Sequence, residues 1–196
     1  MTPEEIRNLR QINFRQTNAY AMQNGILLGV VAITSLGSFV IGLSFPLFST
    51  FSLLLTLLFP LLALGLTLRF RREVAAQLPF SFSRGFSHTL LSVLYAGIWA
   101  GIATFVYMAF FDHGYIFEQY LTHLSRPDMQ QMMQETGLNE QIRVSTGGLS
   151  PQQVIEQLRD ISAGTYAAMI IYLYILSAPL LAVLGGFIAL RRSSRF

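Results

Sequence analysis

Four long apolar segments constrain the fold of this chain more than any other feature of its sequence. They occupy residues 19–43, 50–68, 86–111 and 165–190, and none contains an aspartate, glutamate, arginine or lysine. A helix needs roughly 20 apolar residues to cross roughly 30 Å of hydrocarbon, because each residue adds about 1.5 Å. Strands of a membrane barrel would be about half as long and would alternate in polarity. The sequence therefore predicts an all-α polytopic membrane protein with four transmembrane helices.

The composition agrees with a chain solvated by lipid. Of the 196 residues, 53% are hydrophobic and only 12% are charged, against about 25% charged in a typical soluble domain. The net charge of +3 would fit a nucleic-acid-binding protein only if the arginines gathered on one soluble face, and here they flank the apolar segments instead. We therefore expect the lipid bilayer as a partner and no nucleic acid. The chain has no cysteine, which excludes disulfides and thiolate metal sites.

The arginines predict the orientation in the membrane. Ten of the thirteen lie in the segments 1–18, 69–85 and 191–196, which fall on one side of a four-helix protein. Basic residues near helix ends are retained in the cytoplasm, so we expect both termini on the cytoplasmic side of a bacterial inner membrane. The arginines expected to fix this topology and to contact lipid headgroups are Arg69, Arg71, Arg72, Arg84, Arg191 and Arg192.

Four regions result from this layout. Residues 1–18 form a cytoplasmic tail, residues 19–111 hold the first three transmembrane helices, and residues 165–196 hold the fourth with a basic tail. Residues 112–164 form a helical extracytoplasmic insertion. Within it, the third transmembrane helix is expected to continue outside the bilayer as far as Pro127, and residues 139–148 read as an irregular turn.

A further helix is predicted after that turn. Ser150, Pro151 and Gln153 have the spacing of a helix N-cap with a capping box. Two interpretations of the insertion are open: an exposed face that binds a partner or a lipid headgroup, or a closed pair of helices. The residues concerned are Met129, Met132, Met133, Ile155 and Leu158.

Small residues recur along three of the apolar segments at intervals of about four. Small faces let membrane helices approach closely, either inside one bundle or between copies or partners. The candidate helix-packing residues are Ala21, Gly25, Gly29, Ala96, Gly97, Ala100, Gly101, Ala178, Ala182 and Gly186.

Candidate chemistry is sparse. His88 is the only ionisable residue inside an apolar segment, and it lies close to the predicted cytoplasmic interface. Asp112, His113, Glu118 and His123 gather after the third segment, but their spacing does not match a metal-binding helix. No catalytic, metal-binding or cofactor-binding residue is identified, so the chain is not expected to be an enzyme.

The motif Ser81-Phe82 with Phe86 leads into the third apolar segment and precedes a polar, Met- and Gln-rich insertion. With the four-helix layout, it resembles the Bacteroidetes inner-membrane family catalogued as domain of unknown function 4199, over roughly residues 19–192. The resemblance implies an inner-membrane location and no assigned activity, and it points to a membrane glycosyltransferase as a candidate partner.

Two functions fit these features. The first is a non-enzymatic accessory or scaffold protein that assembles with another envelope protein through its helix faces and insertion. The alternative is a small oligomeric transporter or flippase for a lipid-like substrate. That alternative expects five residues to line one shared cavity: Ser35, Ser38, Ser92, Thr104 and Tyr107.

Overall fold

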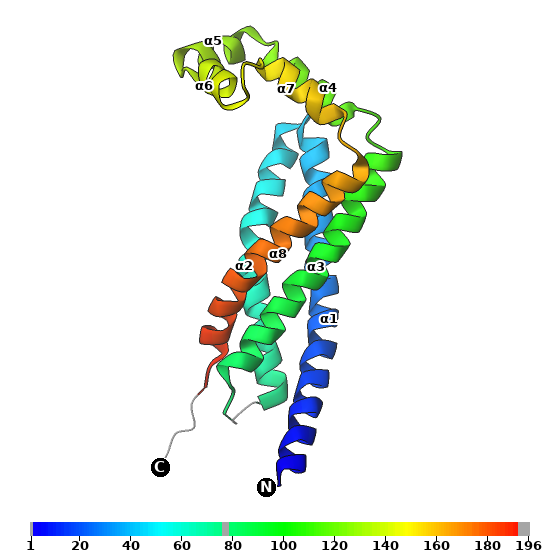
Figure 1. Ribbon diagram of the computed structural model, residues 1–196, viewed down its shortest axis with the longest axis vertical. Helices are drawn as coiled ribbons and strands as arrows, with labels where there is room; N and C mark the ends of the chain where they lie inside the picture. The colour runs from blue at the N-terminus through cyan, green and yellow to red at the C-terminus, as the bar shows by residue number, and fades with distance from the viewer. Residues whose placement is uncertain (1, 76–78, 192–196) are drawn as a thin grey trace.

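The computed structural model describes residues 2–75 and 79–191, and within them the chain is helical with no strand. Four long helices form a bundle (Figure 1): α1 (Pro3–Gly42), α2 (Pro46–Ala75), α3 (Phe82–Phe110) and α8 (Ala163–Ala189). Each is long and apolar enough to cross a membrane. The predicted all-α fold with four candidate transmembrane helices is confirmed.

Helix α3 is the centre of the bundle. It packs along both α1 and α8, whereas α2 packs mainly on α1 and also touches α8. A tight turn joins α1 to α2, where the Ser49 hydroxyl donates to the Gly42 carbonyl at 2.8 Å. Farther along this pair, the Ser52 hydroxyl donates to the Ser35 carbonyl at 2.9 Å. These bonds tie the two helices as an antiparallel hairpin.

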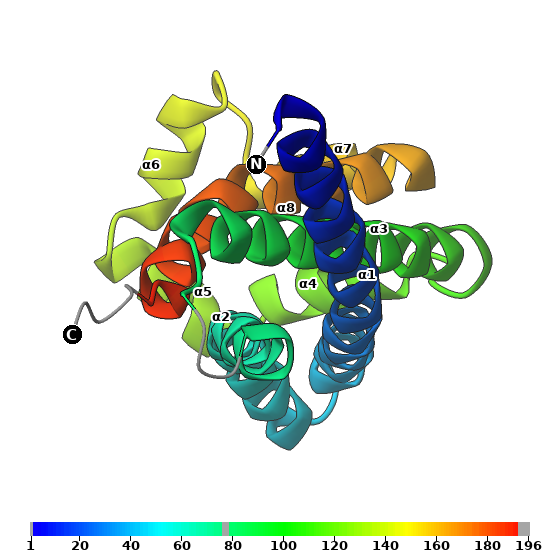
Figure 2. The same cartoon turned by 90° about the horizontal axis from the view of Figure 1, so that it is seen from below.

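One end of the bundle collects most of the described arginines, and we call it the arginine-rich end. It comprises the start of α1, the end of α2, the start of α3 and the end of α8 (Figure 2). Helix α1 has 40 residues, about 60 Å at about 1.5 Å each, so it is longer than a bilayer requires. Its described part begins with the Thr2 N-cap and a Glu5 capping box, so most of the expected tail is helical.

Four short helices lie across the opposite end of the bundle and form the cap (Figure 1): α4 (Tyr115–Leu124), α5 (Pro127–Glu135), α6 (Leu138–Ser145) and α7 (Pro151–Arg159). The expectation that the third transmembrane helix continues into this region was wrong, because α3 ends at Phe110. His113 and Gly114 have φ values of 44° and 87°, which an α-helix does not accept. The Asp112 carboxylate accepts hydrogen bonds from the Gly114 and Ile116 amides and starts α4 instead.

The expectation of an irregular turn over residues 139–148 was also wrong. Helix α6 occupies Leu138–Ser145, and the two glycines that suggested a turn only end it, with positive φ values at Gly147 and Gly148. The predicted start of α7 is confirmed: Ser150 caps the helix and Gln153 completes the capping box.

Candidate functional site

An apolar cavity lies where the cap meets the bundle. It measures about 440 Å³ and is walled by α1, α3 and α8, with α4 and α7 as its roof. Ligand sites in proteins commonly measure roughly 300–1,000 Å³. Its lining includes Leu36, Phe39, Met108, Ile116, Phe117, Ile155, Leu158 and Ile170. We call it the sub-cap cavity.

Two hydroxyl groups of this lining are engaged by the backbone. The Thr104 hydroxyl donates to the Ala100 carbonyl at 2.9 Å, which leaves its methyl group for the cavity. The Tyr166 hydroxyl donates to the Leu158 carbonyl at 2.6 Å. A wall of this kind offers hydrocarbon contacts and almost no hydrogen bonds, so it suits an apolar ligand.

Three contacts connect the roof helices to each other or to the bundle. The hydroxyls of Ser44 and Tyr115 lie 2.6 Å apart, and His123 donates through Nε2 to the Leu43 carbonyl at 3.1 Å. Both link α4 to the turn between α1 and α2. The Arg159 guanidinium lies 3.8 Å from the Glu118 carboxylate and links α7 to α4.

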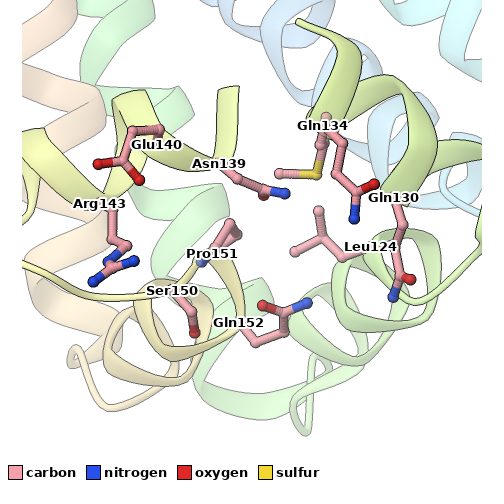
Figure 3. Close-up of a pocket in the computed structure, with 10 residues that line it drawn as sticks. Leu124, Gln130, Gln134, Asn139, Glu140, Arg143, Ser150, Pro151 and Gln152 are labelled. Carbon is pink, nitrogen blue, oxygen red and sulfur yellow. The ribbon is translucent and has the colours of Figure 1, made fainter. Parts of the chain in front are cut away.

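The five cap residues proposed as a partner face do not form one surface. Ile155 and Leu158 line the sub-cap cavity. Met133 is buried and lines a separate pocket of about 290 Å³ within the cap, whereas Met129 is half-buried and Met132 exposed. Figure 3 shows this second pocket, whose lining is rich in amide side chains: Gln130, Gln134, Asn139 and Gln152. These four side chains are exposed or half-exposed, so water can solvate them.

The candidate helix-packing residues lie inside the bundle of a single chain. All ten are buried: Ala21, Gly25, Gly29, Ala96, Gly97, Ala100, Gly101, Ala178, Ala182 and Gly186. A Cβ added at Gly29 would lie 2.8 Å from Trp99 Cβ, and one added at Gly97 would lie 2.5 Å from Tyr174 Cβ. The small residues of α1 and α8 thus let these helices pack closely against α3, and the small residues of α3 do the same from its side.

A buried polar network around His88 was missed by sequence reasoning. The ring is fully buried and stacks on Phe70, with centroids 4.3 Å apart. Its Nε2 lies 2.9 Å from the Asn24 amide nitrogen, and its Nδ1 lies 3.0 Å from the Thr67 hydroxyl. Thr67 in turn lies 2.7 Å from the Thr89 hydroxyl. Both ring nitrogens are therefore engaged, and the network joins α1, α2 and α3.

The arginines of the arginine-rich end have different surroundings. Arg69 pairs with Glu73 at 2.7 Å, and Arg71 donates to the Ile188 carbonyl at 3.4 Å. Arg72 is exposed. Arg191 forms an isolated antiparallel bridge with Phe80, in which each amide donates to the other carbonyl at 3.0 Å. Arg192 lies outside the described residues.

The polar residues expected to line a transport route do not share one cavity. Thr104 and Tyr107 line the sub-cap cavity. Ser35 lines another cavity, of about 340 Å³, between α1, α2 and α8. Ser38 and Ser92 are buried, and the Ser92 hydroxyl donates to the His88 carbonyl of its own helix.

Comparison with known proteins places the chain in one family. A family model described as "Protein of unknown function (DUF4199)" matches residues 23–191, which include most of the four long helices and the whole cap. No curated protein and no solved structure matches the chain. The chain belongs to the DUF4199 family of proteins of unknown function.

Proposed function

We propose that this protein is a non-enzymatic accessory protein of the bacterial inner membrane that holds the hydrocarbon chain of a lipid-like molecule beneath its cap. The sub-cap cavity is the observation that carries the proposal. Its volume of about 440 Å³, its apolar lining and its position between transmembrane and cap helices all suit such a chain.

The arrangement of the bundle supports an accessory role with a second envelope protein. The small-residue faces are filled inside the chain, so a partner would meet the exposed apolar surfaces of α2 or the outer surface of the cap. The outward side chains of α2 include Leu54, Leu57 and Leu61, all more than half exposed. The partner that we propose is a membrane glycosyltransferase, which would use a lipid-linked substrate and receive it from this protein. In this proposal the cap lies outside the cytoplasm, and the gathering of arginines at the opposite end of the bundle supports that orientation.

The alternative of a transporter or flippase has less support from the geometry. Its five expected polar residues are divided between two cavities and two buried positions. A lipid path would also need polar groups that accompany the headgroup across the bilayer.

The test is purification of the tagged full-length protein from its own membranes in a mild detergent, with the retained lipids and proteins identified by mass spectrometry. We expect one lipid class to be enriched over the bulk membrane, together with a membrane enzyme. Ile155→Gln places an amide in the roof of the cavity and should abolish the lipid enrichment. Val144→Gln is the matched control, because Val144 is 74% exposed on α6 and does not line the cavity. A retained lipid composition equal to that of the bulk membrane would contradict the proposal.

A further inference from the structure

Arg84 lines a separate cavity, at the opposite end of the bundle from the cap. This cavity measures about 260 Å³ and lies between the first turns of α3 and the neighbouring part of α1. All of its lining side chains except Phe14 are polar: Asn13, Thr17, Ser81, Ser83, Arg84 and Ser87. We call it the Arg84 cavity, and it shares no lining residue with the sub-cap cavity.

The Arg84 guanidinium is held in place by neutral groups. Its Nε donates to the Thr17 hydroxyl at 3.4 Å, and its Nη2 donates to the Gln16 amide oxygen. Its Cζ lies 5.4 Å from the ring centroid of Phe70 and 5.5 Å from that of Phe80, within the range of cation–π contacts. These contacts fix the side chain, which lines the cavity, before any ligand arrives.

No carboxylate balances the charge of Arg84 within residues 2–75 and 79–191. Neither of the ion pairs between described side chains, Arg69–Glu73 and Arg159–Glu118, includes it, and the described lining of the Arg84 cavity contains no acidic side chain. Arg84 is half-buried, and withdrawing a cation from water costs free energy unless an opposite charge or hydrogen bonds compensate. An anion bound in the cavity would supply the missing charge.

We propose that the Arg84 cavity binds a phosphate group. A guanidinium offers a planar set of donors that fits the oxygens of a phosphate. The hydroxyls of Ser83 and Ser87 and the amide of Asn13 add neutral donors around the same space. A phospholipid headgroup and free phosphate share this chemistry. The cavity lies where the apolar course of α3 begins, and in a bilayer the end of a spanning helix meets the lipid headgroups, so the headgroup is the expected source.

The test measures lipid binding to the purified full-length protein by native mass spectrometry, with phosphatidylglycerol as the anionic probe and phosphatidylcholine as the probe without net charge. Losing one charge-assisted hydrogen-bond donor set should weaken binding roughly tenfold or more. We expect this loss for phosphatidylglycerol in Arg84→Gln. Arg7→Gln is the control, because Arg7 is an exposed arginine of α1 at the same end that does not line the cavity.

A second variant keeps the test informative if Arg84→Gln fails to fold. Ser83→Asp places a carboxylate in the cavity, and an acidic residue in the first turn of a helix is favourable to the fold. It should retain the wild-type Tm and lose phosphatidylglycerol binding. Inorganic phosphate tests the other source: an Arg84-dependent rise in Tm with phosphate, without selective lipid binding, would assign the cavity to a free anion. Equal lipid binding by wild type, Arg84→Gln and Ser83→Asp without a phosphate effect would overturn the proposal. An equal loss in Arg7→Gln would overturn it as well.

Discussion

Replacing Asn24 with leucine should destabilise the protein by orphaning one nitrogen of His88. A hydrogen bond of 2.9 Å joins the side chains of Asn24 and His88, and the two residues are 8% and 0% exposed, respectively. Once the Asn24 amide is removed, Nε2 of His88 has no hydrogen-bond partner in the network in either tautomer, because Thr67 contacts the other ring nitrogen, Nδ1. An orphaned buried acceptor costs about 1–3 kcal/mol, and hydrogen bonds in membrane proteins average about 0.6 kcal/mol with a maximum near 1.7. We expect a loss of about 1–2 kcal/mol.

The assay is reversible unfolding by dodecyl sulfate of the protein in mixed micelles. The single tryptophan, Trp99, packs against Gly29 at the contact of α1 with α3 and provides the fluorescence signal. Asn8→Leu is the matched control, since Asn8 is exposed on the same helix. In a His88→Leu background, Asn24→Leu should cost less than about 0.5 kcal/mol, because no ring nitrogen is left to orphan. An equal cost in both backgrounds would refute the reasoning.

Three further predictions concern packing and the cap. Gly97→Ala should lower the free energy of unfolding by about 1–3 kcal/mol, because the added Cβ would lie 2.5 Å from Tyr174 Cβ. Gly37→Ala should be neutral or stabilising, because nothing lies within 4 Å of its added Cβ. Both variants are measured by the same unfolding assay. Asp112→Ala should cost about 0.5–2 kcal/mol and speed amide hydrogen exchange in α4 but not in α3, and equal protection of α4 in both proteins would contradict this. Glu118→Gln should change stability by less than about 1 kcal/mol, because its ion pair with Arg159 spans 3.8 Å and is exposed; a larger loss would show that this pair holds the roof.

The transmembrane helices could be predicted from sequence because length and apolar composition are local properties. The start of α7 was predictable for the same reason, since its capping box spans only Ser150 to Gln153. The end of α3 was not. It depends on positive φ values at His113 and Gly114 and on the Asp112 carboxylate turning toward the next helix. Helix α6 could not be predicted, because it has only eight residues and the turn-favouring Gly147 and Gly148 follow it closely.

The candidate sites depend on contacts between distant parts of the chain. Asn24 and His88 are 64 positions apart, and nothing in either segment alone pairs them. The sub-cap cavity combines five helices, so its existence depends on how the cap sits on the bundle. The signals available in the sequence were Ile155 and Leu158 of the cap, together with Thr104 and Tyr107 of the third apolar segment, and all four line the cavity.

Photo-crosslinking with a lipid that carries a diazirine in its hydrocarbon chain tests the central claim most directly. The protein is reconstituted with the probe, and the labelled peptides are mapped by mass spectrometry. We predict strong labelling of α4 and α7 around the sub-cap cavity. In Ile170→Trp this labelling should be severalfold weaker, because the indole ring of the introduced tryptophan fills part of the cavity. Leu57→Trp, on the exposed face of α2, should leave this labelling unchanged. Labelling confined to the outward faces of the bundle, or unchanged in Ile170→Trp, would contradict the claim that a lipid chain occupies this cavity.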